Sequence, residues 1–166
     1  MTDEKKLIKF LDGMEYAMMT TSNRDGGLYS RPMATLNVEE DEFDGKLWFF
    51  TKLNTPKVDE LKENPHVNLS YMNSAKQKYA SVSGRADISQ DRQKMSELWN
   101  PLFSTWFPEG LEDPEIALIS VSVDSAELWD SPPSSVVQLA GFIKAKITGE
   151  AWDHSNDQEK LHLRGH

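Results

Sequence analysis

The spacing of hydrophobic positions along the chain predicts many short strands and a few short helices. Leu7 and Leu11 lie one helical turn apart, Thr2 or Asp3 before them can cap a helix, and Gly13 follows as a stop signal. Further along, apolar and polar residues alternate or form short apolar runs, as they do in half-buried and buried strands. These patterns predict strands over residues 15–21, 28–38, 46–51, 66–73, 79–89, 116–123 and 126–129.

Turn residues connect the predicted strands in a way that favours antiparallel pairing. Residues 23–27 (Asn-Arg-Asp-Gly-Gly) predict a hairpin between the first two strands, because glycine tolerates positive φ and Asn and Asp bond their own backbone. Single helices are predicted after Thr55 and after Ser89, the second one extending to Leu102. The predicted fold class is α+β with mainly antiparallel strands, and a meandering barrel fits this order better than a parallel doubly wound sheet.

The C-terminal part of the chain has a different pattern. Pro132 and Pro133 break the last predicted strand, and the apolar stretch 136–147 after them is predicted to be helical. Residues 151–166 are polar and lack apolar periodicity. We therefore expect one domain over residues 1–150, followed by a polar and loosely held tail over residues 151–166.

Composition narrows the classes of function. The chain of 166 residues has 18 Lys and Arg against 27 Asp and Glu, a formal net charge of −9, which disfavours nucleic acids and anionic membranes as partners. The absence of cysteine excludes a disulfide scaffold, a thiol nucleophile and an iron–sulfur cluster. No stretch approaches the roughly 20 apolar residues of a membrane span, and the N-terminus lacks a secretory pattern, so we expect a cytoplasmic protein.

Several familiar sites have no counterpart in the sequence. There is no glycine-rich dinucleotide or phosphate-loop motif and no serine nucleophile elbow. His162 and His166 are four residues apart and would share a helical face as metal ligands, but a tail without a metal site is the more common explanation of such a pair. We expect no metal site.

Two segments combine unusual residue types. Arg31-Pro32 stands within a predicted strand, although proline gives a sheet ladder no donor and belongs at edges or bulges. The backbone that follows could therefore serve a ligand, or the strand could simply lie at the edge of the sheet. The second segment, Thr55-Pro56-Lys57, begins a helix, where free N–H groups attract anions. Arg31 and Lys57 flank one buried strand, so both could reach a single phosphate group.

These segments, in this order, resemble the pyridoxamine 5′-phosphate oxidase-like FMN-binding split barrels, and within them the general stress protein 26 group. The likeness covers about residues 5–150. It rests on the motifs Ser30-Arg31-Pro32-Met33, Trp48-Phe49-Phe50-Thr51, Thr55-Pro56-Lys57-Val58, Trp106-Phe107-Pro108-Glu109-Gly110 with Asp113-Pro114-Glu115, and Glu127-Leu128-Trp129-Asp130. The resemblance implies a split β-barrel with peripheral helices that works as a homodimer and holds FMN between its subunits.

The resemblance also implies a role for individual residues. Arg31 and Lys57 would bind the FMN phosphate with help from Thr55, while Phe50 and Thr51 would line the edge of the isoalloxazine ring. Pro32 and the backbone groups after it would bind the cofactor by facing that ring, and the partner subunit would add an aromatic side chain. The backbone groups would be those of Met33 and Ala34, and the aromatic side chain would be that of Trp129.

The function implied is that of a flavin-dependent oxidoreductase acting on an unknown small molecule, with NAD(P)H as a candidate electron donor and a connection to stress. Pyridoxine phosphate oxidation is not supported, because Leu161-His162-Leu163-Arg164 matches the substrate-binding end of the true oxidases only superficially. Two alternatives stay open. One is a flavin reservoir without turnover, and the other is a barrel that binds deazaflavin F420 or haem.

Overall fold

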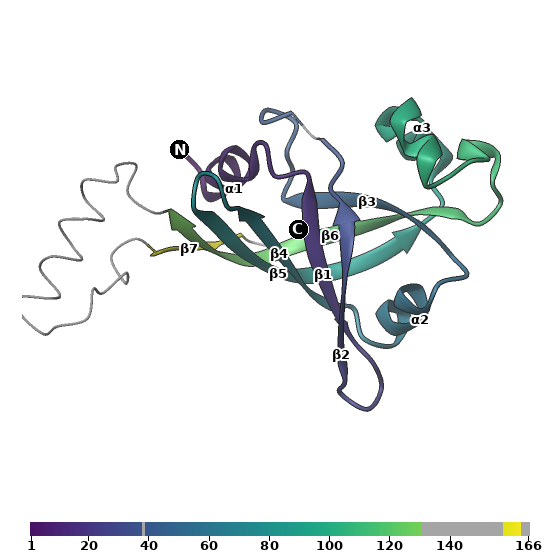
Figure 1. The fold of residues 1–166 in the computed structure, drawn as a ribbon, viewed down its shortest axis with the longest axis horizontal. Helices are drawn as coiled ribbons and strands as arrows, with labels where there is room; N and C mark the ends of the chain where they lie inside the picture. Colours follow the sequence, from purple (N-terminus) through teal and green to yellow (C-terminus); the bar gives the residue numbers. More distant parts are fainter. Residues whose placement is uncertain (38, 131–157, 164–166) are drawn as a thin grey trace, which may run out of the picture.

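The computed structural model of the chain describes residues 1–37, 39–130 and 158–163, and an antiparallel sheet forms its centre (Figure 1). The sheet order is β2-β1-β4-β5-β6-β3, and β7 also pairs with β6. The strands are β1 (Tyr16–Ser22), β2 (Leu28–Ala34), β3 (Lys46–Lys52), β4 (His66–Asn73), β5 (Lys78–Ser89), β6 (Ile116–Asp130) and β7 (Gln158–His162). The predicted α+β class with mainly antiparallel strands is confirmed.

Three α-helices lie outside the sheet: α1 (Asp3–Leu11), α2 (Pro56–Glu63) and α3 (Arg92–Leu98). Two short 3₁₀ helices, η1 (Pro101–Thr105) and η2 (Gly110–Glu112), follow α3, and we call residues 92–113 the insert. The insert and α2 lie toward one end of the sheet, whereas β7 lies at the other end (Figure 1). No helix in the described ranges has both the length and the apolar composition needed to cross a membrane.

Strand β3 separates two hydrophobic clusters because its side chains alternate. Phe49 faces the main core, which the inner faces of the sheet and helix α1 build around Leu69 and Tyr71. Phe50 faces a smaller cluster beneath the insert, where it packs with Met95. The insert is thus attached to the barrel through an apolar contact of its own.

Strand β6 is longer than the sequence predicts, since one strand of 15 residues replaces the two expected over 116–123 and 126–129. The pairing of β5 with β6 shifts register between Ser83 and Gly84, which leaves Asp124 of β6 unpaired with β5. The two strands continue to pair on both sides of this irregularity. A Cβ atom at Gly84 would lie 2.3 Å from the Ser122 carbonyl oxygen, so only glycine fits this close approach.

The structure corrects three further details of the prediction. β2 ends at Ala34 rather than at residue 38, and the cap of α3 is Asp91, whose side chain accepts from the Lys94 N–H, rather than Ser89. The third helix ends at Leu98, because Pro101 begins a separate 3₁₀ turn. The helix predicted over 136–147 lies outside the described residues.

The expectation of a loose tail is wrong for its described part. Gln158–His162 form strand β7, which pairs with Ser125–Trp129 of β6. Leu161 is buried in the main core, and Leu163 belongs to the same core. These two apolar side chains, together with backbone pairing to β6, hold the segment as a strand. Pattern analysis missed this strand because it needs several alternating apolar positions.

Candidate functional site

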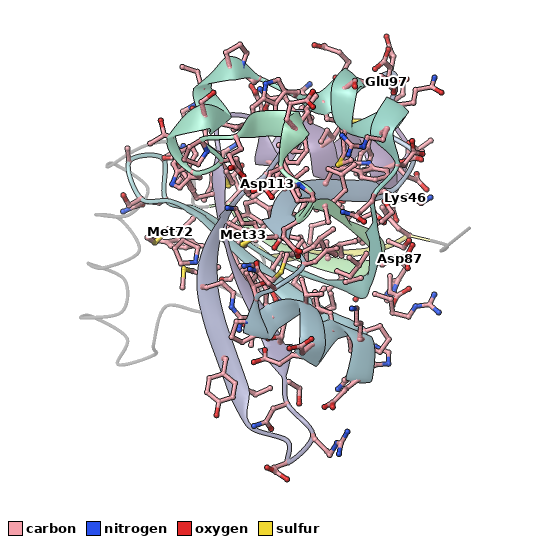
Figure 2. The ribbon with its side chains drawn as sticks, turned by 90° about the vertical axis from the view of Figure 1, so that its right-hand side faces the viewer. Met33, Lys46, Met72, Asp87, Glu97 and Asp113 are labelled. Carbon is pink, nitrogen blue, oxygen red and sulfur yellow. The ribbon has the colours of Figure 1, made fainter. Side chains whose placement is uncertain are left out.

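A cavity of about 270 Å³ opens on one side of the barrel, between helix α2 and the insert. Figure 2 shows these two elements at opposite ends of that side, with Met33 and Asp113 between them. The cavity is lined by Tyr16, Pro32, Met33, Ala34, Leu36, Phe50, Thr51, Lys52, Thr55, Lys57, Phe103, Trp106 and Phe107. Seven of the nine cofactor-binding residues predicted from the sequence are among them, all except Arg31 and Trp129.

Strand β2 brings backbone to one wall of the cavity. Pro32 pairs with Met18 and Ala34 with Tyr16, and β2 is the terminal strand of the sheet path. A proline is tolerated there because no strand needs its missing donor. Within the described sheet, no strand pairs with the outer edge of β2, so the backbone beside the buried Met33 is available to a ligand.

Helix α2 begins at the other wall. Thr55 is its N-cap residue, but the Thr55 hydroxyl donates to the Lys52 carbonyl oxygen at 2.8 Å and makes no side-chain cap bond. Lys57, in the first turn, lines the cavity. Burial lowers the pKa of Lys57, and the positive charge of Arg31 lowers it further, while Glu60 acts in the opposite direction.

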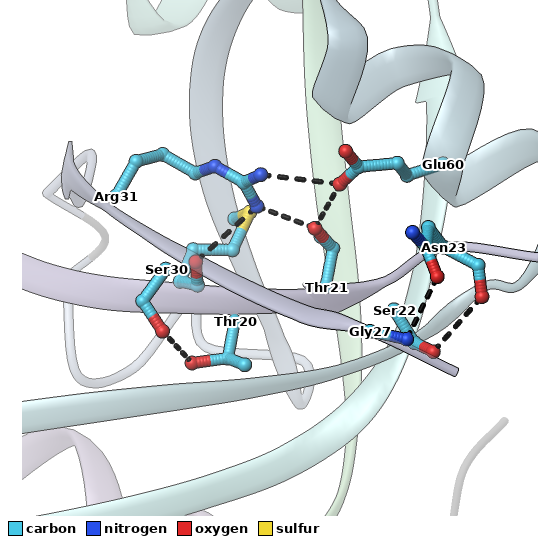
Figure 3. A network of polar contacts seen from close by, with 9 residues as sticks. Thr20, Thr21, Ser22, Asn23, Gly27, Ser30, Arg31 and Glu60 are labelled. Atoms are coloured by element: carbon cyan, nitrogen blue, oxygen red, sulfur yellow. Dashed lines mark hydrogen bonds and ion pairs between the residues drawn. The ribbon is translucent and has the colours of Figure 1, made fainter. Parts of the chain in front are cut away.

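Arg31 does not line the cavity; its guanidinium turns toward helix α2 (Figure 3). It donates to the Glu60 carboxylate at 3.1 Å and to the Thr21 hydroxyl at 2.5 Å, and Thr21 in turn donates to Glu60. The Arg31 and Glu60 side chains are only 23% and 16% exposed. These bonds hold the Arg31 guanidinium in place. Its positive charge lowers the pKa of Lys57, which shows that the two side chains lie near each other.

Thr51 is a buried residue of the cavity lining. It is 2% exposed, and its Oγ1 is the one buried side-chain polar atom in the described part of the chain for which the structure shows no hydrogen-bond partner. Leaving a buried hydroxyl without a hydrogen-bond partner lowers the stability of the fold by about 1–3 kcal/mol. This position thus fits a ligand that supplies a polar edge.

A matching model of the family described as "Pyridoxamine 5′-phosphate oxidase like" covers residues 2–153 of the sequence. This chain belongs to the pyridoxamine 5′-phosphate oxidase-like family. Protein bli-3 of Neurospora crassa is 34% identical over 153 residues, a match that covers 87% of this chain and 72% of that protein.

Solved structures support the same family assignment and its split-barrel fold. The general stress FMN/FAD binding protein of Xanthomonas citri is 26% identical, with a TM-score of 0.67, and the match covers 79% of this chain and 90% of that one. General stress protein 26 of Bacillus anthracis is 23% identical, with a TM-score of 0.65, over 77% and 94% of the two chains. The resemblance to the general stress protein 26 group is confirmed.

The cavity of this family member includes residues that the sequence analysis did not assign to the site. Phe103, Trp106 and Phe107 come from the insert, and we call them the aromatic wall. Residues 106–110 were recognised as a family motif, but nothing in the local sequence indicates that the insert folds back onto Phe50. Tyr16 was also missed, and its pairing with Ala34 in the predicted hairpin is the signal that could have identified it.

Trp129 lies away from the cavity. It stands on β6 between Tyr79 of β5 and Gln158 of β7, and its side chain is half-buried. Its predicted contact with a flavin in a partner subunit stays a prediction. His162 is exposed on β7 and His166 lies outside the described residues, and no group of three or more potential metal ligands occurs among the described ones.

Proposed function

We propose that the cavity binds FMN, with the phosphate at helix α2 and the isoalloxazine ring against β2 and β3. The observation that carries the proposal is the cavity lining itself. One continuous surface joins a cationic helix start at Lys57 to the available backbone beside Met33 and to the unpartnered hydroxyl of Thr51. A flavin mononucleotide combines an anionic end with a flat ring of polar edges, which matches this sequence of groups.

The charges at the α2 end suit a phosphate. Lys57 and Arg31 contribute two positive charges and Glu60 one negative charge, so the cluster has a net positive charge within a protein of net charge −9. A phosphate monoester carries about −1.5 to −2 at neutral pH. Its arrival would relieve the repulsion between Lys57 and Arg31.

When bound, FMN would supply electron-transfer chemistry, while the chain would position it and exclude competing reactions. Such a site requires no cysteine and no catalytic base. We propose that the protein is an oxidoreductase with a small-molecule substrate and NAD(P)H as a candidate electron donor. The similarity to a general stress FMN/FAD binding protein supports the flavin and a connection to stress.

We also propose that the protein is a homodimer, because one face of the sheet exposes a row of apolar side chains. Met72 is 64% exposed and pairs with Tyr79, which is 41% exposed, and Tyr79 pairs with Trp129. Exposed Tyr16 continues the row into the cavity lining. A second copy covering this face would also enclose the open side of the cavity.

The dimer proposal predicts a particle of twice the 18.9 kDa chain mass. Met72→Lys should convert it to a monomer, because it would place a charge at the centre of the apolar row. Gln93→Lys adds the same charge at an exposed position on α3 and should leave the mass unchanged. Light scattering at micromolar concentration checks both variants. A wild-type monomer that binds FMN tightly would contradict the proposal.

The absorption spectrum of the purified protein tests the cofactor. We expect the bands of an oxidised flavin, after reconstitution with FMN if necessary. The spectra of haem and of deazaflavin F420 differ from that of FMN, so either would replace the proposal. No histidine occurs among the described residues that line the cavity, which disfavours haem. Anaerobic mixing with NADH or NADPH then distinguishes an enzyme, whose flavin is bleached quickly, from a reservoir.

A further inference from the structure

We infer that the aromatic wall binds a flat, uncharged aromatic substrate beside the flavin. The inference rests on the proposed function, since it places this substrate next to bound FMN. It assigns a substrate class to the end of the cavity that lies farthest from the phosphate-binding charges of helix α2 (Figure 2).

The wall is built around Phe50 of β3. The ring centroid of Phe50 lies 5.7 Å from that of Phe103 and 6.1 Å from that of Phe107, and Trp99 meets Phe50 edge to face at 5.4 Å. These distances are typical of attractive aromatic pairs. Phe103 and Phe107 are therefore packed against Phe50 rather than standing as independent side chains.

Polar contacts fix the insert that carries the wall. Asp113, 4% exposed, forms an ion pair with Lys52 at 3.0 Å, which ties the end of the insert to β3. The Arg92 guanidinium donates to the Leu111 carbonyl oxygen at 2.7 Å, and the Asn100 side chain caps η1 by accepting from the Leu102 N–H. The first of these contacts ties the insert to the barrel and the other two link residues within the insert, so we expect the wall to keep its shape when a ligand leaves, as a preformed subsite does.

Trp106 distinguishes the wall from an ordinary core. Phe50 is 6% exposed, as expected for a core residue, whereas Trp106 lines the same cavity and is 54% exposed. An indole ring that is half free at the mouth of a cavity offers its surface to a ligand, and aromatic rings prefer to stack on or to meet the edge of other flat rings.

The charges around the wall favour an uncharged ligand. No carboxylate occurs among the described residues that line the cavity, and the ammonium of Lys52 is neutralised by Asp113. The pKa of the Asp113 carboxyl is lowered by the Glu115 backbone N–H and by Lys52, so this neutralisation persists at neutral pH. An ionised ligand would find no free counter-charge at this end, whereas a neutral aromatic molecule loses little by leaving water.

The test uses the FMN-loaded protein and two probes with the same carbon skeleton. 2-Naphthol is flat and aromatic, while trans-2-decalol keeps the hydroxyl but is neither. We expect 2-naphthol to bind and to perturb the flavin absorption spectrum, and decalol to bind at least tenfold more weakly by calorimetry. Trp106→Ala should weaken 2-naphthol about tenfold, and Trp106→Phe should restore most of the affinity.

Leu102→Ala is the matched control, because Leu102 is 74% exposed on η1, the 3₁₀ helix that directly precedes Trp106, but does not line the cavity. It should leave 2-naphthol binding unchanged. Equal affinity for the two probes would overturn the inference, as would a Trp106→Ala variant that loses FMN and riboflavin instead of 2-naphthol, since the wall would then hold the flavin itself. Loss of dimer mass in Trp106→Ala would assign the residue to a contact between copies. A protein that takes up no flavin overturns the proposed function, and the inference falls with it.

Discussion

Replacing Leu161 by alanine is expected to lower the free energy of unfolding by about 2–5 kcal/mol. Leu161 is 1% exposed and belongs to the main core, although it lies in a segment whose sequence predicts a loose tail. Its strand, β7, pairs with β6 and is tied to helix α1 by an ion pair of 2.7 Å between Lys6 and Glu159. The exposed ion pair contributes little, so the buried leucine should account for most of the effect.

Urea unfolding of the cofactor-free protein, at one fixed protein concentration, measures this loss without a contribution from bound ligand. Leu102→Ala is the control: it removes a leucine that is 74% exposed and should change the stability by less than about 0.5 kcal/mol. A Leu161→Ala variant as stable as wild type would mean that β7 does not belong to the core. Flavin binding by a chain truncated after Glu150 would then also be expected.

Arg31→Ala should weaken FMN binding by about tenfold to a hundredfold, because Arg31, although it does not line the cavity, supplies one of the two positive charges near the phosphate, and a charge-assisted contact contributes about 1.5–3 kcal/mol. Without Arg31, the positive charge of Lys57 is cancelled by Glu60, and the phosphate meets no net charge. The change also leaves Glu60 and Thr21 without their shared donor, so the variant should be less stable as well.

A second variant separates the two effects of Arg31. Glu60→Gln keeps a hydrogen-bonding side chain beside Arg31 but removes the negative charge, so the cluster becomes more positive. We expect FMN to bind this variant as tightly as wild type or more tightly, measured by fluorescence titration. Weaker FMN binding by Glu60→Gln, with riboflavin unaffected, would show instead that the carboxylate is needed to aim Arg31.

The same titrations should depend on pH through Lys57. Its pKa is lowered by burial and by Arg31, so its positive charge is lost at a lower pH than that of an ordinary lysine. FMN affinity should therefore fall as the pH rises through that lowered value. Lys57→Arg, which keeps its charge, should remove the decline.

Local signals were sufficient to predict the parts of the site that local structure positions. Proline after Thr55 fixes the start of α2, and the apolar run of β3 ends at Phe50 and Thr51 just before it, so the sequence led to residues that share one cavity. Arg31 was placed on the correct strand, but its ion pair with Glu60 depends on how α2 packs against the sheet. Sequence spacing does not contain that information.

The parts that were missed depend on contacts between distant segments. Trp106 reaches the cavity because the insert folds over Phe50, more than 50 positions earlier in the sequence. β7 becomes a strand because β6 is long enough to pair with β3 along one half and with β7 along the other. Neither outcome can be predicted from the residues of the segment alone, since the partner supplies the stabilising surface.

The most direct test of the central claim compares FMN with riboflavin, which lacks the phosphate, in fluorescence titrations of wild type and Lys57→Ala. If Lys57 binds the phosphate, the variant should lose about tenfold to a hundredfold in FMN affinity and bind riboflavin as wild type does. Equal losses for both flavins would show that Lys57 supports the fold rather than the phosphate. Unchanged affinity for FMN would contradict the proposed site.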